Sequence, residues 1–176
     1  MSDLIKTKAM ETTNKSLSVF LVDDDRMFLL SLKNELKRRF KNITLSTFIN
    51  GEDCLSHLGE KPDIVILDYY LTAGIPGALN GMEVLKKIKS ISNSIQVVML
   101  SAQDKLEVAA SAIKYGAIEY VAKSETAFIR LQNVLKNSMD VIEYSRETKQ
   151  YEAWNYLMAL FLLIYTAVTA LYYLNH

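Results

Sequence analysis

One short stretch near the N-terminus decides the fold: residues 17–28 have the sequence LSVFLVDDDRMF. A mostly apolar run, typical of a buried strand, is followed at once by three aspartates and then by apolar residues at helical spacing. Three neighbouring carboxylates disfavour one another's ionisation. The stretch therefore predicts a strand whose carboxyl end gathers negative charge that something else must offset.

The same strand-then-helix pattern continues along the chain. Strands are expected at 17–22, 43–48, 63–68, 95–100 and 118–123. Helices are expected at 26–40, 51–60, 82–91, 105–116 and 125–150. This alternation predicts an α/β domain with a doubly wound, five-stranded parallel sheet, and the apolar strands fit because such strands are buried on both faces.

The composition limits the functions available to the chain. Its 176 residues include 20 basic and 20 acidic side chains, so there is no net charge, which argues against a nucleic-acid-coating protein. Cys54 is the only cysteine, which excludes an internal disulfide and fits a reducing compartment. We expect Cys54 to be a small buried hydrophobe, and His57 and His176 to be surface residues.

The two ends of the chain differ from the middle. Residues 1–16 are polar and are expected to form a flexible tail, and the folded domain is expected over 17–148. Residues 149–176 are predicted to hold a single-pass transmembrane helix, with 153–174 in the membrane, because Trp154–Leu174 is almost wholly apolar. A buried or dimerising helix is the alternative.

The orientation of that segment follows from its flanking charges. Arg146 and Lys149 precede the apolar run and no basic residue follows it. The positive-inside tendency then places the folded domain in the cytoplasm. The alternative is a cytoplasmic protein without a membrane segment.

Polar side chains stand at the predicted carboxyl ends of four strands. Asp23 and Asp24 follow the first strand, Asp68 ends the third, Ser101 follows the fourth, and Lys123 ends the fifth. Functional sites of open parallel sheets lie at this edge. Clustered carboxylates suit Mg²⁺, and an ammonium and a hydroxyl beside them suit phosphoryl transfer to a carboxylate. Asp25, where the first helix begins, is expected to cap that helix instead.

These motifs carry a family resemblance. The sequences VDDD (22–25), ILD (66–68), MLSA (99–102) and YVAK (120–123) resemble, in order and spacing, the receiver domain of two-component response regulators over about residues 17–145. The resemblance implies a flavodoxin-like sheet in the strand order 2-1-3-4-5, here followed by the C-terminal apolar helix.

The resemblance also implies a role for each site residue. Asp68 would be the phosphoacceptor, and Mg²⁺ would be bound by Asp24, Asp68 and the backbone carbonyl of Tyr70, with Asp23 acting mainly through water. Ser101 and Lys123 would bind the phosphoryl group. Tyr120 would act with Ser101 as the switch.

Partners follow from the same resemblance. A histidine kinase, a phosphotransfer protein or a small acyl phosphate would be the phosphodonor. No DNA-binding module is visible, so the output is expected to be contact with an unknown protein, or a phosphate sink, held near a membrane. A homodimer could form through the face of the fourth helix, fifth strand and last helix, or through the C-terminal helix. The chain is not expected to be an enzyme beyond phosphoryl transfer to its own aspartate and its loss.

Two other classes remain open. A pseudo-receiver would be an interaction module that is not phosphorylated, which the intact Asp68, Ser101 and Lys123 argue against. An Mg²⁺-dependent aspartate-nucleophile phosphohydrolase would need a DxDxT pattern, which VDDDRMF does not supply.

The sequence departs from the family pattern at two places. Lys123 is followed by Ser124 where the family has proline, so a cis bond would cost about 3 kcal/mol more. We expect either trans geometry or a strained cis bond at this position. The loop at 69–81 is several residues longer than usual. It is either a harmless insertion or a lid or docking element beside Asp68.

Overall fold

A computed structural model gives the structure of the chain and describes residues 16–71, 76–103 and 105–174. Side-chain surroundings are described within these ranges except at 142–150, 169 and 172–174. The predicted N-terminal tail lies outside the described residues except for Ser16. His176 and part of the predicted 69–81 insertion also lie outside them.

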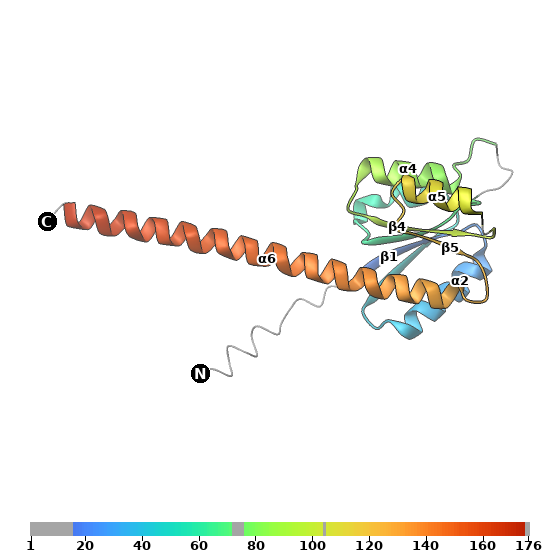
Figure 1. The fold of residues 1–176 in the computed structure, drawn as a ribbon, viewed down its shortest axis with the longest axis horizontal. Coiled ribbons are helices and arrows are strands. Elements are labelled where there is room, and N and C mark those ends of the chain that lie inside the picture. Colours follow the sequence, from blue (N-terminus) through green and yellow to red (C-terminus); the bar gives the residue numbers. More distant parts are fainter. Residues whose placement is uncertain (1–15, 72–75, 104, 175–176) are drawn as a thin grey trace. The chain divides into compact units, whose positions relative to one another are not determined.

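Five parallel strands form one sheet, as predicted (Figure 1). The strands are β1 (Leu17–Val22), β2 (Ile43–Phe48), β3 (Ile64–Asp68), β4 (Gln96–Ser101) and β5 (Glu119–Ala122). Their order is β2-β1-β3-β4-β5, which confirms the predicted 2-1-3-4-5 arrangement. Because the order reverses between β1 and β3, the crevice beyond their carboxyl ends is the expected place for a site.

Helices lie on both faces of the sheet. They are α2 (Arg26–Arg39), α3 (Gly51–Ser56), the 3₁₀ turn η1 (Leu58–Glu60), α4 (Gly81–Ile91), α5 (Leu106–Lys114) and α6 (Ala127–Leu174). In Figure 1, α4 and α5 lie on one side of the strands, and α2 and the start of α6 lie on the other. The predicted single helix over 51–60 is wrong, because it is divided into α3 and η1 at His57.

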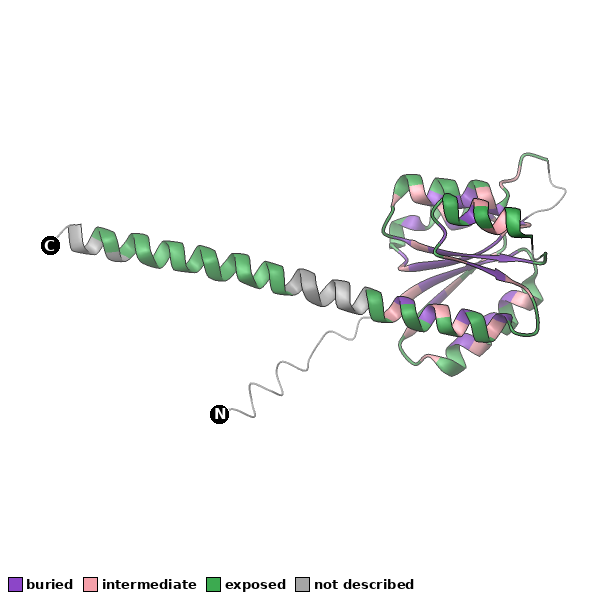
Figure 2. Cartoon of the chain, in the orientation of Figure 1, coloured by how far each residue is buried: buried purple, intermediate pink, exposed green. Residues whose placement is uncertain are grey.

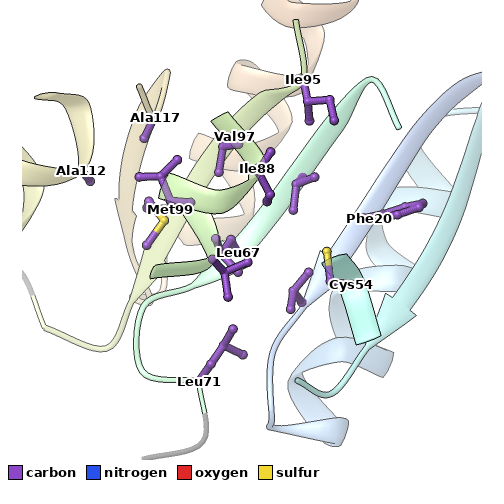
Figure 3. Packing of buried hydrophobic residues seen from close by; sticks show 14 of the residues in the cluster. Phe20, Cys54, Leu67, Leu71, Ile88, Ile95, Val97, Met99, Ala112 and Ala117 are labelled. Carbon is purple, nitrogen blue, oxygen red and sulfur yellow. The ribbon is translucent and has the colours of Figure 1, made fainter. Parts of the chain in front are cut away.

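The core is built from strand residues that are buried on both faces of the sheet (Figure 2). All five residues of β3 are buried, as are five of the six in β4. Figure 3 shows side chains of β3 and β4, such as Leu67 and Met99, gathered with Ile88 of α4 and Cys54 of α3. Cys54 is fully buried, and burial raises its pKa to about 12, so its expected place in the core is confirmed.

Side chains fix where the helices begin. Asp25 Oδ1 accepts hydrogen bonds from the backbone N–H of Met27 and Phe28, which confirms the predicted cap of α2. Asn80 begins α4 in a reciprocal arrangement with Glu83, in which each side chain accepts from the other's backbone N–H.

The last helix, α6, is 48 residues long. No proline or glycine interrupts it, so it continues through the predicted apolar segment as one element. The chain divides into two compact parts, residues 1–136 and 137–176. Among the residues that the structure describes, no helix meets the length and apolarity needed to cross a bilayer, so the transmembrane prediction for 153–174 is not supported.

Candidate functional site

The sheet brings the predicted site residues to one edge. Asp23 directly follows β1, Asp68 is the last residue of β3, Ser101 is the last of β4, and Lys123 directly follows β5. These strands are parallel and adjacent in the order β1-β3-β4-β5, so their carboxyl ends meet at the same rim. Asp23, Asp68 and Ser101 are buried there. Charged and polar side chains are rarely buried unless they are paired, so partners are expected for all three.

Lys123 lies between the two buried carboxylates. Its Nζ is 2.6 Å from Asp23 Oδ2 and 3.0 Å from Asp68 Oδ1. The Lys123–Ser124 peptide bond is trans, so Lys123 reaches both acids without the cis bond that proline favours in the family. One ammonium thus partly offsets two buried carboxylates.

The third carboxylate completes a cluster of oxygen atoms. One carboxylate oxygen from each of Asp23, Asp24 and Asp68 lies within 4.8 Å of the others. Asp23 Oδ2 and Asp68 Oδ1 are buried, and Lys123 Nζ is the positive group beside each of them. The two oxygens of a carboxylate can accept from several partners, and three converging carboxylates fit a hard divalent cation such as Mg²⁺. The residues present therefore suit the metal that the sequence predicted, and the Tyr70 carbonyl stays a predicted ligand.

Burial and crowding perturb the site's titration. Burial raises the pKa of Asp68 to about 6, the Asp23 carboxylate adds to the rise, and Lys123 opposes it. Burial likewise raises the pKa of Asp23 against the effect of Lys123. For Lys123, burial acts to lower the pKa, but the two carboxylates outweigh it and the pKa is raised. Perturbed acids in a cluster of this kind are typical of functional sites.

Ser101 and Tyr120 both bind the chain segment that follows β4. Ser101 Oγ accepts a hydrogen bond from the backbone N–H of Gln103 at 3.2 Å. Tyr120, a buried residue of β5, donates its hydroxyl to the Gln103 carbonyl at 2.5 Å. The two predicted switch residues are therefore linked through one backbone segment.

The start of α4 packs directly on the phosphoacceptor candidate. A Cβ atom added at Gly81 would lie 2.0 Å from the Asp68 carbonyl oxygen, so only glycine fits. The Gly81 N–H donates to the Tyr69 carbonyl at 3.1 Å, which brings together the two ends of the 69–81 loop. Residues 72–75 of that loop lie outside the described residues, so the lid hypothesis stays a prediction.

Sequence reasoning missed two residues of the site. Phe28, on α2, places its ring centroid 4.7 Å from Lys123 Nζ. Gly81 is the other. The sequence places Phe28 three residues after the capping Asp25, in the first turn of a helix that begins beside the acids. The need for glycine at position 81 becomes visible only once α4 is packed against β3.

The comparisons with known proteins agree with this geometry. The family model described as the response regulator receiver domain matches residues 19–136. The transcriptional regulatory protein MalR of Bacillus subtilis is 29% identical over 141 residues, which cover 77% of this chain and 53% of MalR. The chain spans about half or less of the length of the curated relatives it matches.

Solved structures show the same fold. NtrX from Brucella abortus has a TM-score of 0.66 and 25% identity, covering 77% of this chain and 29% of NtrX. The BeF₃-activated receiver domain of DrrB, a Thermotoga maritima protein, has a TM-score of 0.61 and 26% identity, covering 71% of this chain and 98% of that domain. With its five-stranded sheet and its acidic rim, the chain belongs to the response regulator receiver domain family of two-component signalling.

Proposed function

We propose that this chain is a phosphoacceptor receiver that takes a phosphoryl group on Asp68 and signals by contact with another protein. One observation carries the proposal: the buried Asp68 carboxylate has Lys123 Nζ 3.0 Å from its Oδ1 and two more carboxylates beside it. A carboxylate held between fixed positive charge and metal-ligand oxygens is arranged for phosphoryl transfer.

In the proposed step, an Asp68 carboxylate oxygen attacks the phosphorus of a phosphohistidine or a small acyl phosphate. A new O–P bond forms while the donor's N–P or O–P bond breaks, and that electron pair leaves with the imidazole or carboxylate. Lys123 would balance the charge on the phosphoryl oxygens. Ser101, whose Oγ accepts from Gln103, keeps its own proton to donate to one of them.

Mg²⁺ would be held by Asp24 and Asp68, with the Tyr70 carbonyl as a further ligand and Asp23 acting mainly through water. When bound, the ion neutralises negative charge on the phosphoryl group. Water later hydrolyses the acyl phosphate and restores Asp68. The chain would therefore act on its own side chain rather than on a separate substrate, and a histidine kinase or a phosphotransfer protein would be the donor.

The test is incubation of the full chain with Mg²⁺ and acetyl phosphate, followed by intact mass spectrometry. We expect one added phosphoryl group on the wild type and none on Asp68→Asn. Asp63→Asn is the matched control. Asp63 directly precedes the first residue of β3, at the end of the strand away from Asp68, and its Oδ2 accepts a hydrogen bond from the Ser18 N–H. This control should be phosphorylated like the wild type.

Each alternative class has its own outcome in this experiment. Absence of any adduct on the wild type, with the fold intact by circular dichroism, would instead indicate a pseudo-receiver. Continuous release of phosphate from many phosphate esters would indicate a phosphohydrolase. An adduct that persists in Asp68→Asn would move the acceptor to another residue.

A second part of the proposal concerns the distal part of α6, residues 151–171, which we propose inserts into a lipid bilayer. Six consecutive large side chains are exposed there, namely Leu160, Phe161, Leu162, Leu163, Ile164 and Tyr165. Because a helix has about 3.6 residues per turn, six consecutive positions cover every face of it. A second copy would cover one stripe, whereas lipid covers all faces.

Flotation with phospholipid vesicles tests this part. The full chain should float with the vesicles, and a fragment of residues 1–150 should not. Replacing Leu162 and Leu163 by lysine should abolish flotation, because each lysine at the centre of an inserted helix costs roughly 3 kcal/mol. A full chain that only self-associates and never floats would identify a second copy as the partner.

A further inference from the structure

The aromatic residue beside Lys123 suggests a part of the site that the acids alone do not explain. Lys123 Nζ faces Asp23 Oδ2 and Asp68 Oδ1 at 2.6 and 3.0 Å. It also lies 4.7 Å from the centroid of the Phe28 ring. An ammonium has three N–H groups, so two carboxylates and one aromatic face together account for its surroundings in the described site.

The position of Phe28 is fixed at its backbone and at its ring. Its backbone N–H donates to the capping Asp25 Oδ1 at 3.0 Å, which fixes the first turn of α2. Its ring stacks on Phe128 of α6, with centroids 6.1 Å apart and planes 21° from parallel. A side chain fixed in this way has little freedom to move away from Lys123.

We propose that Phe28 is a positioning residue for phosphoryl transfer, whose ring holds the Lys123 ammonium against Asp68 by a cation–π interaction. This inference rests on the proposed function of Asp68. Lys123 is a long, flexible side chain, and the two carboxylates could bind it in more than one arrangement. The ring restricts the ammonium to the place where it meets a phosphoryl oxygen.

The alternative is that Phe28 is only a packing residue between α2 and α6. Both hypotheses predict that Phe28→Ala lowers the rate of phosphorylation, so that variant does not distinguish them. Only the positioning hypothesis requires the negative electrostatic potential on the face of the ring. Fluorine atoms on the ring weaken its negative face while leaving its shape and apolarity nearly unchanged.

The experiment is therefore a series of fluorinated phenylalanines incorporated at position 28 of the full chain. The rate of phosphorylation by acetyl phosphate at saturating Mg²⁺ is measured for each member. We expect the rate to fall stepwise with each added fluorine, by a total of roughly threefold to thirtyfold, in line with the range of cation–π strengths. Natural variants should follow the same order, with Phe28→Tyr close to wild type and Phe28→Leu as slow as the fully fluorinated ring.

The same series at Phe48 is the matched control. Its ring packs on Phe20, with centroids 4.8 Å apart, and on His57, with centroids 5.2 Å apart. Fluorination there should leave the rate unchanged. A second readout is the NMR shift of the Lys123 ε-methylene protons, which the Phe28 ring current should displace in the wild type and in Phe28→Tyr but not in Phe28→Leu.

The outcomes separate this inference from the function on which it rests. A flat rate across the fluorinated series, or full activity in Phe28→Leu, would overturn the positioning role while Asp68 stays the acceptor. A wild type that takes up no phosphoryl group would overturn both. An unshifted Lys123 methylene in the wild type would show that the ring does not face the ammonium and would also reject the inference.

Discussion

Three adjacent aspartates have identical side chains but different surroundings. Asp23 is buried and pairs with Lys123, Asp24 is exposed at the rim, and Asp25 caps α2. The Asp25 N–H also donates to Asp23 Oδ1 at 3.0 Å, so the cap helps to orient the buried acid. The repulsion suggested by the sequence is thus partly offset by one ammonium, and it is reduced because only one of the three carboxylates is buried.

At the residue scale, Asp68 should destabilise the fold in the absence of a divalent cation. Its pKa in the folded protein, about 6, lies above the ordinary value of 3.8. The folded state therefore holds the proton more tightly, so the energetic cost is absent below about pH 4, grows as the pH rises, and is fully present above about pH 6. A difference of one in pKa corresponds to about 1.4 kcal/mol, so the cost is on the order of 3 kcal/mol.

Asp68→Asn should accordingly raise the free energy of unfolding at pH 7 in EDTA by roughly 1 to 3 kcal/mol, and by much less at pH 4. Urea denaturation at several pH values measures both. Millimolar Mg²⁺ should stabilise the wild type more than the variant. Equal stability of the two proteins at pH 7 without metal would show that the buried carboxylate carries no such cost.

A second residue-scale prediction concerns the cap. Asp25→Ala should lower the free energy of unfolding by about 1 kcal/mol, because the N–H groups of Met27 and Phe28 lose their acceptor. Asp25→Asn keeps an acceptor oxygen and should lose much less. If denaturation shows that asparagine costs as much as alanine, the charge rather than the cap is what matters.

At the scale of elements, the contact between α4 and β3 decides how close the loop after Asp68 can lie to the sheet. Gly81→Ala should lower the free energy of unfolding by roughly 2 kcal/mol or more, because the new Cβ would lie 2.0 Å from the Asp68 carbonyl oxygen. Thermal denaturation measures the loss.

The control for this prediction is Gly59→Ala. A Cβ at Gly59 would meet no atom within 4 Å, and its backbone is not left-handed, so this variant should be neutral or slightly stabilising. Similar losses at both glycines would attribute the effect to backbone entropy rather than to the packing of α4 on Asp68.

At the scale of the whole molecule, burial ends early in α6. Leu131, Leu135 and Ser138 are buried, and no described residue after Ser138 is. A fragment of residues 1–141 should therefore keep a cooperative unfolding transition and the same phosphoryl uptake as the full chain. Circular dichroism and the acetyl phosphate assay measure these.

A fragment of residues 1–126 is the matched comparison. It lacks Leu131 and Leu135, both fully buried, and each loss from a core costs about 2 to 5 kcal/mol. It should not fold cooperatively. A well-folded 1–126 fragment would show that α6 is not needed to cover its face of the sheet.

The sequence by itself determined the strands, their parallel arrangement and the residues at their carboxyl ends, and the family resemblance supplied the strand order. Strands that are buried on both faces need a nearly continuous apolar run, which is visible in the sequence. A parallel sheet places the carboxyl ends of all its strands at one rim. For the same reason Asp23, Asp68, Ser101 and Lys123 could be assigned before any contact was known. Helix limits were less certain, as at His57, because a 3₁₀ turn and an α-helix share the same local pattern.

Only the tertiary structure decided what lies between elements that are far apart in the chain. The ring of Phe28 over Lys123 and the contact of Gly81 with Asp68 join residues of different elements, and no local periodicity encodes such a pair. The shared use of Lys123 by two acids was undecided for the same reason. The sequence names the charged groups, whereas packing sets their distances, and electrostatic energy and chemistry depend on those distances.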